Sequence, residues 1–146
     1  MPHTHHASAS YSHETSATTA TIWGFFTDVA GWKEWNAGVY SCVLEGLFIK
    51  GTWMTMVLPD QEVIKSQLVE VTEPTGFTDE TTLGDITVRV RHEVSLLPAG
   101  NCSITYTIDV NGIGAQAVCD QVSSDFPDVL RALAERAERA ERQVSQ

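Results

Sequence analysis

Three polar side chains that could do chemistry, Asp79, His92 and Tyr106, occur in three successive segments with the pattern of β-strands. An aspartate beside an imidazole can hold the ring in one tautomer and raise its basicity, and a tyrosine hydroxyl can donate to a ligand carbonyl. Together these groups could orient a ligand or move a proton. Whether they meet depends on the register of the strands that carry them.

The turns between these segments predict that register. A two-residue turn at 84–85, with glycine first, pairs Phe77 with His92, and a three-residue loop at 98–100 pairs His92 with Tyr106. A slip of one residue at either turn would separate the polar groups. Both turns place one set of apolar side chains on the face that carries them: Ile86, Val88, Val90, Val94, Ile104, Ile108 and Val110.

His92 therefore has three interpretations. It can be a general acid or base, a hydrogen-bonding contact for a bound ligand, or a core residue satisfied by its neighbours. We predict that its imidazole faces the interior, within hydrogen-bonding reach of Tyr106, Asp79 or a water molecule that joins them. Tyr11 and His13 are weaker candidates for the same face.

Apolar residues from other segments complete the predicted lining. The segment 51–58 is apolar on both faces, so its methionines either adapt to a ligand or pack in the core. Val90 shares the face of the polar groups, and Phe126 and Leu130 come from the last helix. The predicted ligand-binding residues are His92, Tyr106, Asp79, Met54, Met56, Val90, Phe126 and Leu130.

The element that must cover this face is a long amphipathic helix over residues 114–142, whose apolar side chains recur in one stripe. Pro127 removes a backbone donor and disfavours the helical state of Phe126. We therefore expect a kink or short break near residues 123–127, with Phe126 turned toward whatever lies beneath the helix.

The remaining segments predict an antiparallel sheet. Tight turns join consecutive strands, two short helices lie between the first and second strands, and the class is α+β. A threonine at 18 or 19 can cap the first short helix, which runs to about residue 26, and the second spans about 28–36. The predicted strands are 7–15, 40–44, 51–58, 62–72, 77–83, 86–97 and 101–110.

The charge of the chain bounds its partners. The formal net charge is −10, and residues 1–130 hold five basic against sixteen acidic residues, so no basic patch is available for nucleic acid or for an anionic membrane surface. No apolar run approaches the ~20 residues of a membrane span, and we expect no secretory signal. We expect one domain over residues 1–146, with 1–6 frayed.

Motif searches exclude several enzyme classes. The chain has no glycine-rich phosphate loop, no Gly-x-Ser-x-Gly and no His, Cys or Glu set at metal-ligand spacing, so we expect no metal and no cofactor. Histidines at 3, 5 and 6 could bind metal only loosely. Three cysteines without paired spacing, Cys42, Cys102 and Cys119, predict buried free thiols in a reducing cytoplasm.

Several of these features together resemble the START-like, or SRPBCC, superfamily, which has the fold of the birch pollen allergen. The resemblance covers about residues 7–142, and the most similar members are bacterial proteins described as polyketide cyclase/dehydrase-like. It implies a helix-grip fold, in which a curved seven-stranded sheet wraps the long helix around a cavity for an apolar ligand. The residues that carry it are Trp23, the run Asp28-Val29-Ala30-Gly31-Trp32-Lys33-Glu34-Trp35-Asn36, Gly46 with Gly51-Thr52, Phe77-Thr78-Asp79-Glu80, Arg89-Val90-Arg91-His92 and the tail helix.

Function is less constrained than fold, since one fold serves many activities. The first hypothesis is a cytoplasmic protein that binds a small apolar or aromatic metabolite or lipid between sheet and helix. The alternatives are a cyclase or dehydrase-type enzyme using His92 as acid or base, and a protein-interaction module without a ligand. The oligomeric state is open, with a homodimer among the possibilities.

Overall fold

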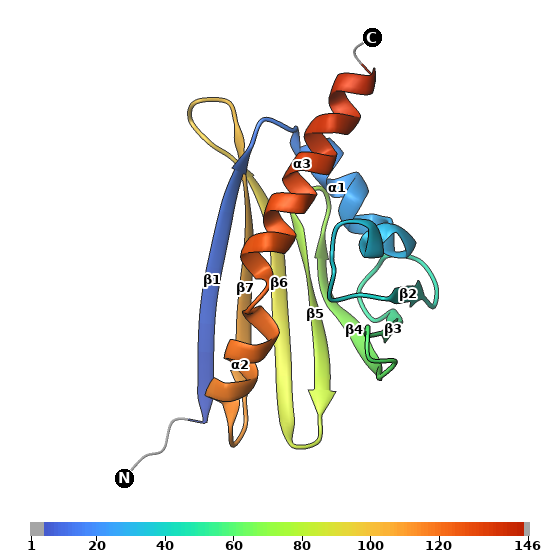
Figure 1. The fold of residues 1–146 in the computed structure, drawn as a ribbon, viewed down its shortest axis with the longest axis vertical. Helices are drawn as coiled ribbons and strands as arrows, with labels where there is room; N and C mark the ends of the chain where they lie inside the picture. Colours follow the sequence, from blue (N-terminus) through green and yellow to red (C-terminus); the bar gives the residue numbers. More distant parts are fainter. Residues whose placement is uncertain (1–4, 145–146) are drawn as a thin grey trace.

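The fold is a seven-stranded antiparallel sheet that curves around the C-terminal helices (Figure 1). It is described for residues 5–144 by a computed structural model. The strand order is β1-β7-β6-β5-β4-β3-β2, so β1 and β2 are the edges. This confirms the predicted α+β helix-grip architecture. The strands are β1 (His6–Thr15), β2 (Ser41–Leu44), β3 (Trp53–Val57), β4 (Val63–Thr72), β5 (Gly76–Leu83), β6 (Ile86–Leu96) and β7 (Cys102–Asn111).

Two short helices, α1 (Thr19–Thr27) and the 3₁₀ helix η1 (Val29–Glu34), connect β1 to β2, as predicted. The Thr18 hydroxyl accepts a hydrogen bond from the Thr21 amide and so caps α1. Within residues 5–144, no helix is long and apolar enough to cross a membrane.

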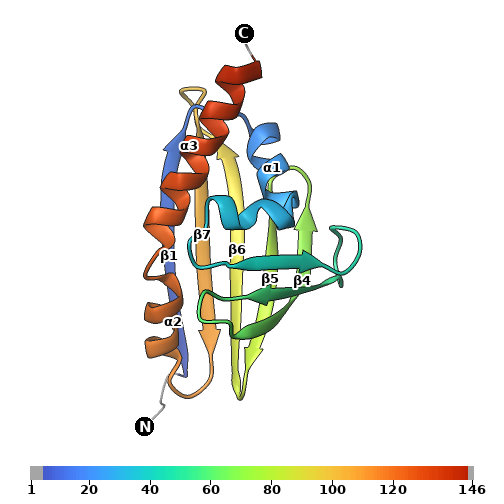
Figure 2. The same ribbon diagram turned by 45° about the vertical axis from the view of Figure 1, so that its right-hand side comes forward.

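The last helix is broken where the proline predicts. It consists of α2 (Ala115–Ser123) and α3 (Phe126–Val144), which lie across the concave face of the sheet (Figure 2). The Ser123 hydroxyl donates to the Cys119 carbonyl and helps to end α2, while the Val129 amide donates to the Asp125 carbonyl in the first turn of α3. The break turns the Phe126 ring inward, where it is 8% exposed.

The predicted strand register is confirmed. Leu83 pairs with Ile86 across the 84–85 turn, and the Leu97 amide donates to the Asn101 carbonyl at the mouth of the 98–100 loop. One boundary was wrong, because His6 already belongs to β1 and the Gly112 amide donates to the His5 carbonyl. Backbone pairing with β7 thus orders the chain from residue 5, while the rest of the predicted frayed segment lies outside the described residues.

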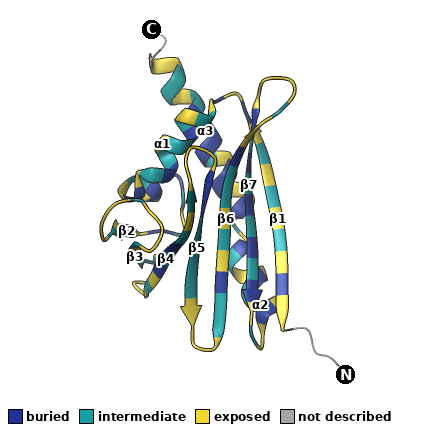
Figure 3. Ribbon diagram, turned by 180° about the vertical axis from the view of Figure 1, so that it is seen from behind, coloured by how far each residue is buried: buried dark blue, intermediate teal, exposed yellow. Residues whose placement is uncertain are grey.

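The two faces of the sheet differ in chemistry, because side chains alternate along each strand. Along β7 every second residue from Cys102 to Val110 is buried against the helices. The outer face carries serine–threonine pairs, such as Ser12 with Thr105 at 2.8 Å, and ion pairs, such as Arg89 with Glu80. Figure 3 shows buried and less buried positions alternating along β7. All three cysteines are free and buried, as predicted.

The helix α3 is held against the sheet by apolar packing and, further along, by two hydrogen bonds. Its apolar stripe, which includes Leu130 and Leu133, is almost fully buried. Further along, Glu138 accepts a hydrogen bond of 2.7 Å from the Thr15 hydroxyl, and Glu141 accepts one of 2.7 Å from the Thr18 amide. These contacts join α3 to the corner between β1 and α1.

We predict that Leu133→Ala lowers the free energy of unfolding by about 2–5 kcal/mol, because Leu133 is 0% exposed and its removal leaves a cavity under α3. Urea denaturation measures this loss. The matched control is Leu96→Ala, where the leucine is 71% exposed and the expected change is below about 1 kcal/mol. Equal losses in the two variants would mean that α3 is not packed on the sheet.

Candidate functional site

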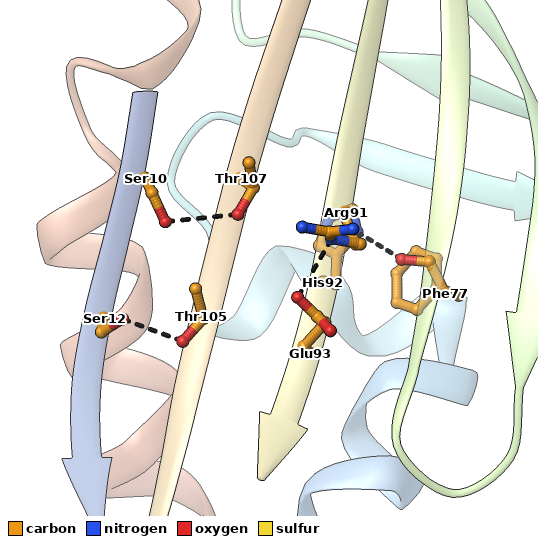
Figure 4. A network of polar contacts seen from close by, with 8 residues as sticks. All are labelled: Ser10, Ser12, Phe77, Arg91, His92, Glu93, Thr105 and Thr107. Atoms are coloured by element: carbon orange, nitrogen blue, oxygen red, sulfur yellow. Dashed lines mark hydrogen bonds and ion pairs between the residues drawn. The ribbon is translucent and has the colours of Figure 1, made fainter. Parts of the chain in front are cut away.

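His92 lies on the inner face, as predicted, and is enclosed by aromatic rings. Its imidazole stacks on Phe77 with ring centroids 4.1 Å apart and an interplanar angle of 9°, and it meets the Tyr106 ring edge-on at 4.5 Å. The neighbouring Arg91 and Glu93 side chains form an ion pair with each other at 3.0 Å on the outer face (Figure 4). The register therefore directs His92 away from the arginines on either side.

His92 forms no direct hydrogen bond with Tyr106 or Asp79, and the predicted alternative of a water molecule that joins them stays a prediction. The imidazole Nδ1 lies 3.4 Å from the Phe77 carbonyl oxygen, and the ring also bonds to the Val90 backbone. Direct cross-strand pairing brings the His92 and Tyr106 rings edge to face, and their polar atoms form no hydrogen bond with each other. Asp79 is opposite Val90, two residues away along β6.

Burial decides the protonation state of His92. It lowers the pKa of the imidazole to about 3, although the backbone contacts with Phe77 and Val90 act in the opposite direction. The ring is therefore neutral at physiological pH. A neutral, stacked imidazole with such a pKa is a weak general base.

Asp79 is the polar group on this face that lacks a counter-charge. It is partly exposed, and burial raises the pKa of its carboxyl to about 7, against the effect of a hydrogen bond with its own backbone. No cation pairs with it among residues 5–144. Burial is the main cause that raises the pKa of Tyr106, and it raises the pKa of the Cys42 thiol to about 12. The charge of Asp79 raises both pKa values further.

Tyr106 joins the sheet to the broken helix. The ring of Phe126 meets it edge-on at 5.4 Å and meets Tyr11 of β1 at 5.8 Å. The hydroxyl of Tyr11 lies 3.2 Å from that of Ser123, at the end of α2. The helix break thus turns Phe126 inward, as the sequence predicts, against two rings of the inner face.

The other predicted lining residues divide into two groups. Met54 and Leu130 are 0% and 1% exposed and belong to the core, whereas Met56 and Val90 are partly exposed. The methionines share the inner face of β3, since Met54 pairs with Ser66 and Met56 with Ile64 of β4. A ligand can therefore touch Met56 and Val90 without displacing the core.

Aromatic side chains fill the space around His92, where the family resemblance implies a cavity. Phe77 lies at the centre of this cluster, within 5.8 Å of the ring centroids of Phe26, Trp32 and Phe48 as well as His92. The two surface hollows found in the described residues lie elsewhere, on the outer face and beside the 50–51 turn. The partly exposed part of the inner face lies toward the other end of the sheet, at Asp79, Thr81, Val90, Val118 and Val122.

Sequence reasoning missed two contributors to this arrangement. Gly76 begins β5, where a Cβ atom would lie 2.5 Å from the His92 carbonyl oxygen, so glycine permits the close approach of β5 and β6. Asp125, at the break between α2 and α3, is partly buried, and its charge raises the pKa of Tyr106. The available signals were a glycine after a turn and an acid two residues before a proline.

Comparison with known proteins identifies the family. Residues 6–138 match the family model described as polyketide cyclase / dehydrase and lipid transport, so the chain belongs to that family. No curated protein matches the chain.

Solved structures with the same fold share little sequence with this chain. A START superfamily protein from Mycobacterium smegmatis is 14% identical, with a TM-score of 0.73, over 91% of this chain and 98% of that one. A norcoclaurine synthase point mutant from Thalictrum flavum is 11% identical, with a TM-score of 0.75, over 97% and 99%. The di-domain ARO/CYC StfQ of the steffimycin biosynthetic pathway is 11% identical, with a TM-score of 0.76, over 93% of this chain and 52% of that chain.

We predict that Asp79→Asn stabilises the protein at pH 8 but has little effect at pH 4. The folded-state pKa of Asp79, about 7, lies above its ordinary value of 3.8, so the stability that this carboxyl contributes is present below pH 3.8 and is lost as the pH rises through 7. The urea midpoint at the two pH values measures the difference. Asp85→Asn, in the exposed 84–85 turn, is the control and should leave both midpoints unchanged; a destabilised Asp79→Asn at pH 8 would contradict the prediction.

His92 should change the pH dependence of folding stability in the opposite direction to Asp79. Its folded-state pKa of about 3 is below the ordinary 6.5, so its contribution is present above pH 6.5 and is lost as the pH falls through 3. We predict that His92→Phe, which keeps a ring on Phe77, loses less stability than the wild type between pH 6.5 and 3. Urea midpoints across this range measure the loss, with His13→Phe on β1 as the control. If the midpoints of all three proteins fall in parallel with pH, the prediction is wrong.

Proposed function

We propose that this protein binds a small apolar or aromatic molecule on the partly exposed inner face, between β5–β6 and α2. The single observation that carries the proposal is Asp79, a carboxyl without a counter-charge among residues 5–144, which lies on the inner face opposite Val90 and Leu68 and is partly exposed. A buried polar group that costs stability is a frequent mark of a binding site. Membership of the family favours the same type of role.

The surroundings of Asp79 suit such a ligand. Val90 lies opposite it on β6, Leu68 lies opposite it on β4, and Val118 and Val122 of α2 are partly exposed. These side chains would supply apolar contact area, and Asp79 would supply one polar contact that fixes orientation. Rings of the cluster around Phe77 would form the inner end of the site.

Catalysis by His92, the cyclase or dehydrase-type alternative, has weaker support. The imidazole is stacked on Phe77, and the low pKa of the ring disfavours proton abstraction near neutral pH. Binding without chemistry is therefore the function that we favour. Buried free thiols at Cys42, Cys102 and Cys119 support a cytoplasmic location for it.

We expect native mass spectrometry of freshly purified protein to reveal a bound small molecule, and titration with a panel of lipids, flavonoids and polyketide-like aromatics to report binding through tryptophan fluorescence. Val90→Trp should weaken binding by at least about tenfold, or about 1.4 kcal/mol, because the indole would occupy the partly exposed inner face. The titration of wild type and variant with the same ligand measures this loss.

The matched control is Val63→Trp on β4, where the valine is 58% exposed. It adds the same side chain away from the inner face and should bind as the wild type does. Absence of any binding across the panel and in native mass spectrometry would instead favour a protein-interaction module.

A further inference from the structure

We infer that the site selects ligands carrying a positively charged amine, which would lie against Asp79 while their apolar part lies against the aliphatic and aromatic side chains around it. This inference rests on the proposed function and narrows its ligand to the class of apolar amines. Three features of the described residues support it: the placement of the cations, the placement of the acids and the character of the neighbouring rings.

The cations of this protein are all directed away from the inner face. Eight of the nine lysines and arginines are exposed, and Arg136 is partly exposed with Glu34 at 3.5 Å. Arg89 and Arg91 flank the site in sequence, but they project from the outer face, where they pair with Glu80 and Glu93. Among residues 5–144, therefore, no lysine or arginine pairs with Asp79.

Acidic groups, in contrast, approach the inner face from two elements. Asp79 comes from β5 and Asp125 from the break between α2 and α3; burial is the main cause that raises the pKa of Tyr106, and the charges of both acids raise it further. Burial is the largest cause that raises the pKa of both carboxyls. An ammonium group at Asp79 would supply the missing positive charge in a poorly solvated place, where a charge-assisted hydrogen bond is strong.

Aromatic side chains on the same face begin two residues from Asp79 and from Val90, at Phe77 and His92. The Phe77 ring is 1% exposed, and His92 and Trp32 stack against it at 4.1 Å and 5.8 Å. These neutral side chains border the position of Asp79 and suit the apolar part of an amine. A carboxylate or phosphate ligand would instead be repelled by an ionised Asp79.

The competing interpretation is that Asp79 is protonated when a ligand binds and donates to a ligand carbonyl. The two interpretations differ in the sign of their pH dependence. Ion pairing with an amine needs the ionised carboxyl and strengthens as the pH rises through about 7, whereas donation to a carbonyl weakens over the same range. Burial keeps the pKa of His92 near 3, raises that of Cys42 to about 12 and raises that of Tyr106, so these groups do not change charge over this range. Burial also raises the pKa of Asp125, and the pH series is therefore repeated with Asp125→Asn.

Isothermal titration calorimetry with three probes that share one naphthyl group tests the inference: 2-naphthylethylamine, 2-naphthylethanol and 3-naphthylpropionate. At pH 8 we expect the amine to bind at least about tenfold more tightly than the alcohol, and the carboxylate to bind most weakly. Between pH 6 and 8 the affinity for the amine should rise and that for the alcohol should stay constant.

Asp79→Asn should remove the preference for the amine and retain binding of the alcohol, whereas Asp85→Asn, with the same change in net charge, should retain the preference. Circular dichroism of both variants confirms that the fold is kept. Equal affinities of the wild type for amine and alcohol, or an affinity for the amine that falls with rising pH, would overturn the inference while the proposed function stands. If none of the three probes binds, the inference fails, whereas the proposed function is decided separately by the ligand panel and native mass spectrometry.

Discussion

The arrangement depends on one constraint, the antiparallel register of β5, β6 and β7. Pairing of Phe77 with His92 and of His92 with Tyr106 directs all three side chains to the concave face. Because side chains alternate with a period of two, a slip of one residue would exchange His92 for Arg91 or Glu93 and bury a charge. The hairpin at 84–85, the loop at 98–100 and the missing Cβ of Gly76 all maintain this register.

The same register places two ionisable groups in an apolar layer, and the fold treats them differently. His92 loses its charge, stacks on Phe77 and bonds to backbone carbonyls, so its polarity is satisfied inside the sheet. Asp79 has no such neighbours and keeps a solvent-facing edge. One group has therefore become part of the packing, while the other still needs a partner, and this contrast moves the centre of the candidate site from His92 to Asp79.

Contacts between residues far apart in the chain position the C-terminal helices over this layer. The break between α2 and α3 turns Phe126 onto Tyr106 and Tyr11, and Glu138 and Glu141 hold the distal part of α3 to residues 15–18. The helices are thereby joined to β1, β7 and α1.

The sequence by itself determined the order of elements, the hairpin registers, the helix break and the inner-face position of His92. Each of these follows from local information: turn residues, alternation along strands, and a proline inside an apolar stripe. Only the tertiary structure decided what the inner-face groups do. Whether His92 bonds to Tyr106 or stacks on Phe77, and whether a space remains beside it, depends on rings such as Trp32 and Phe48, which arrive from distant segments and whose directions no local pattern encodes.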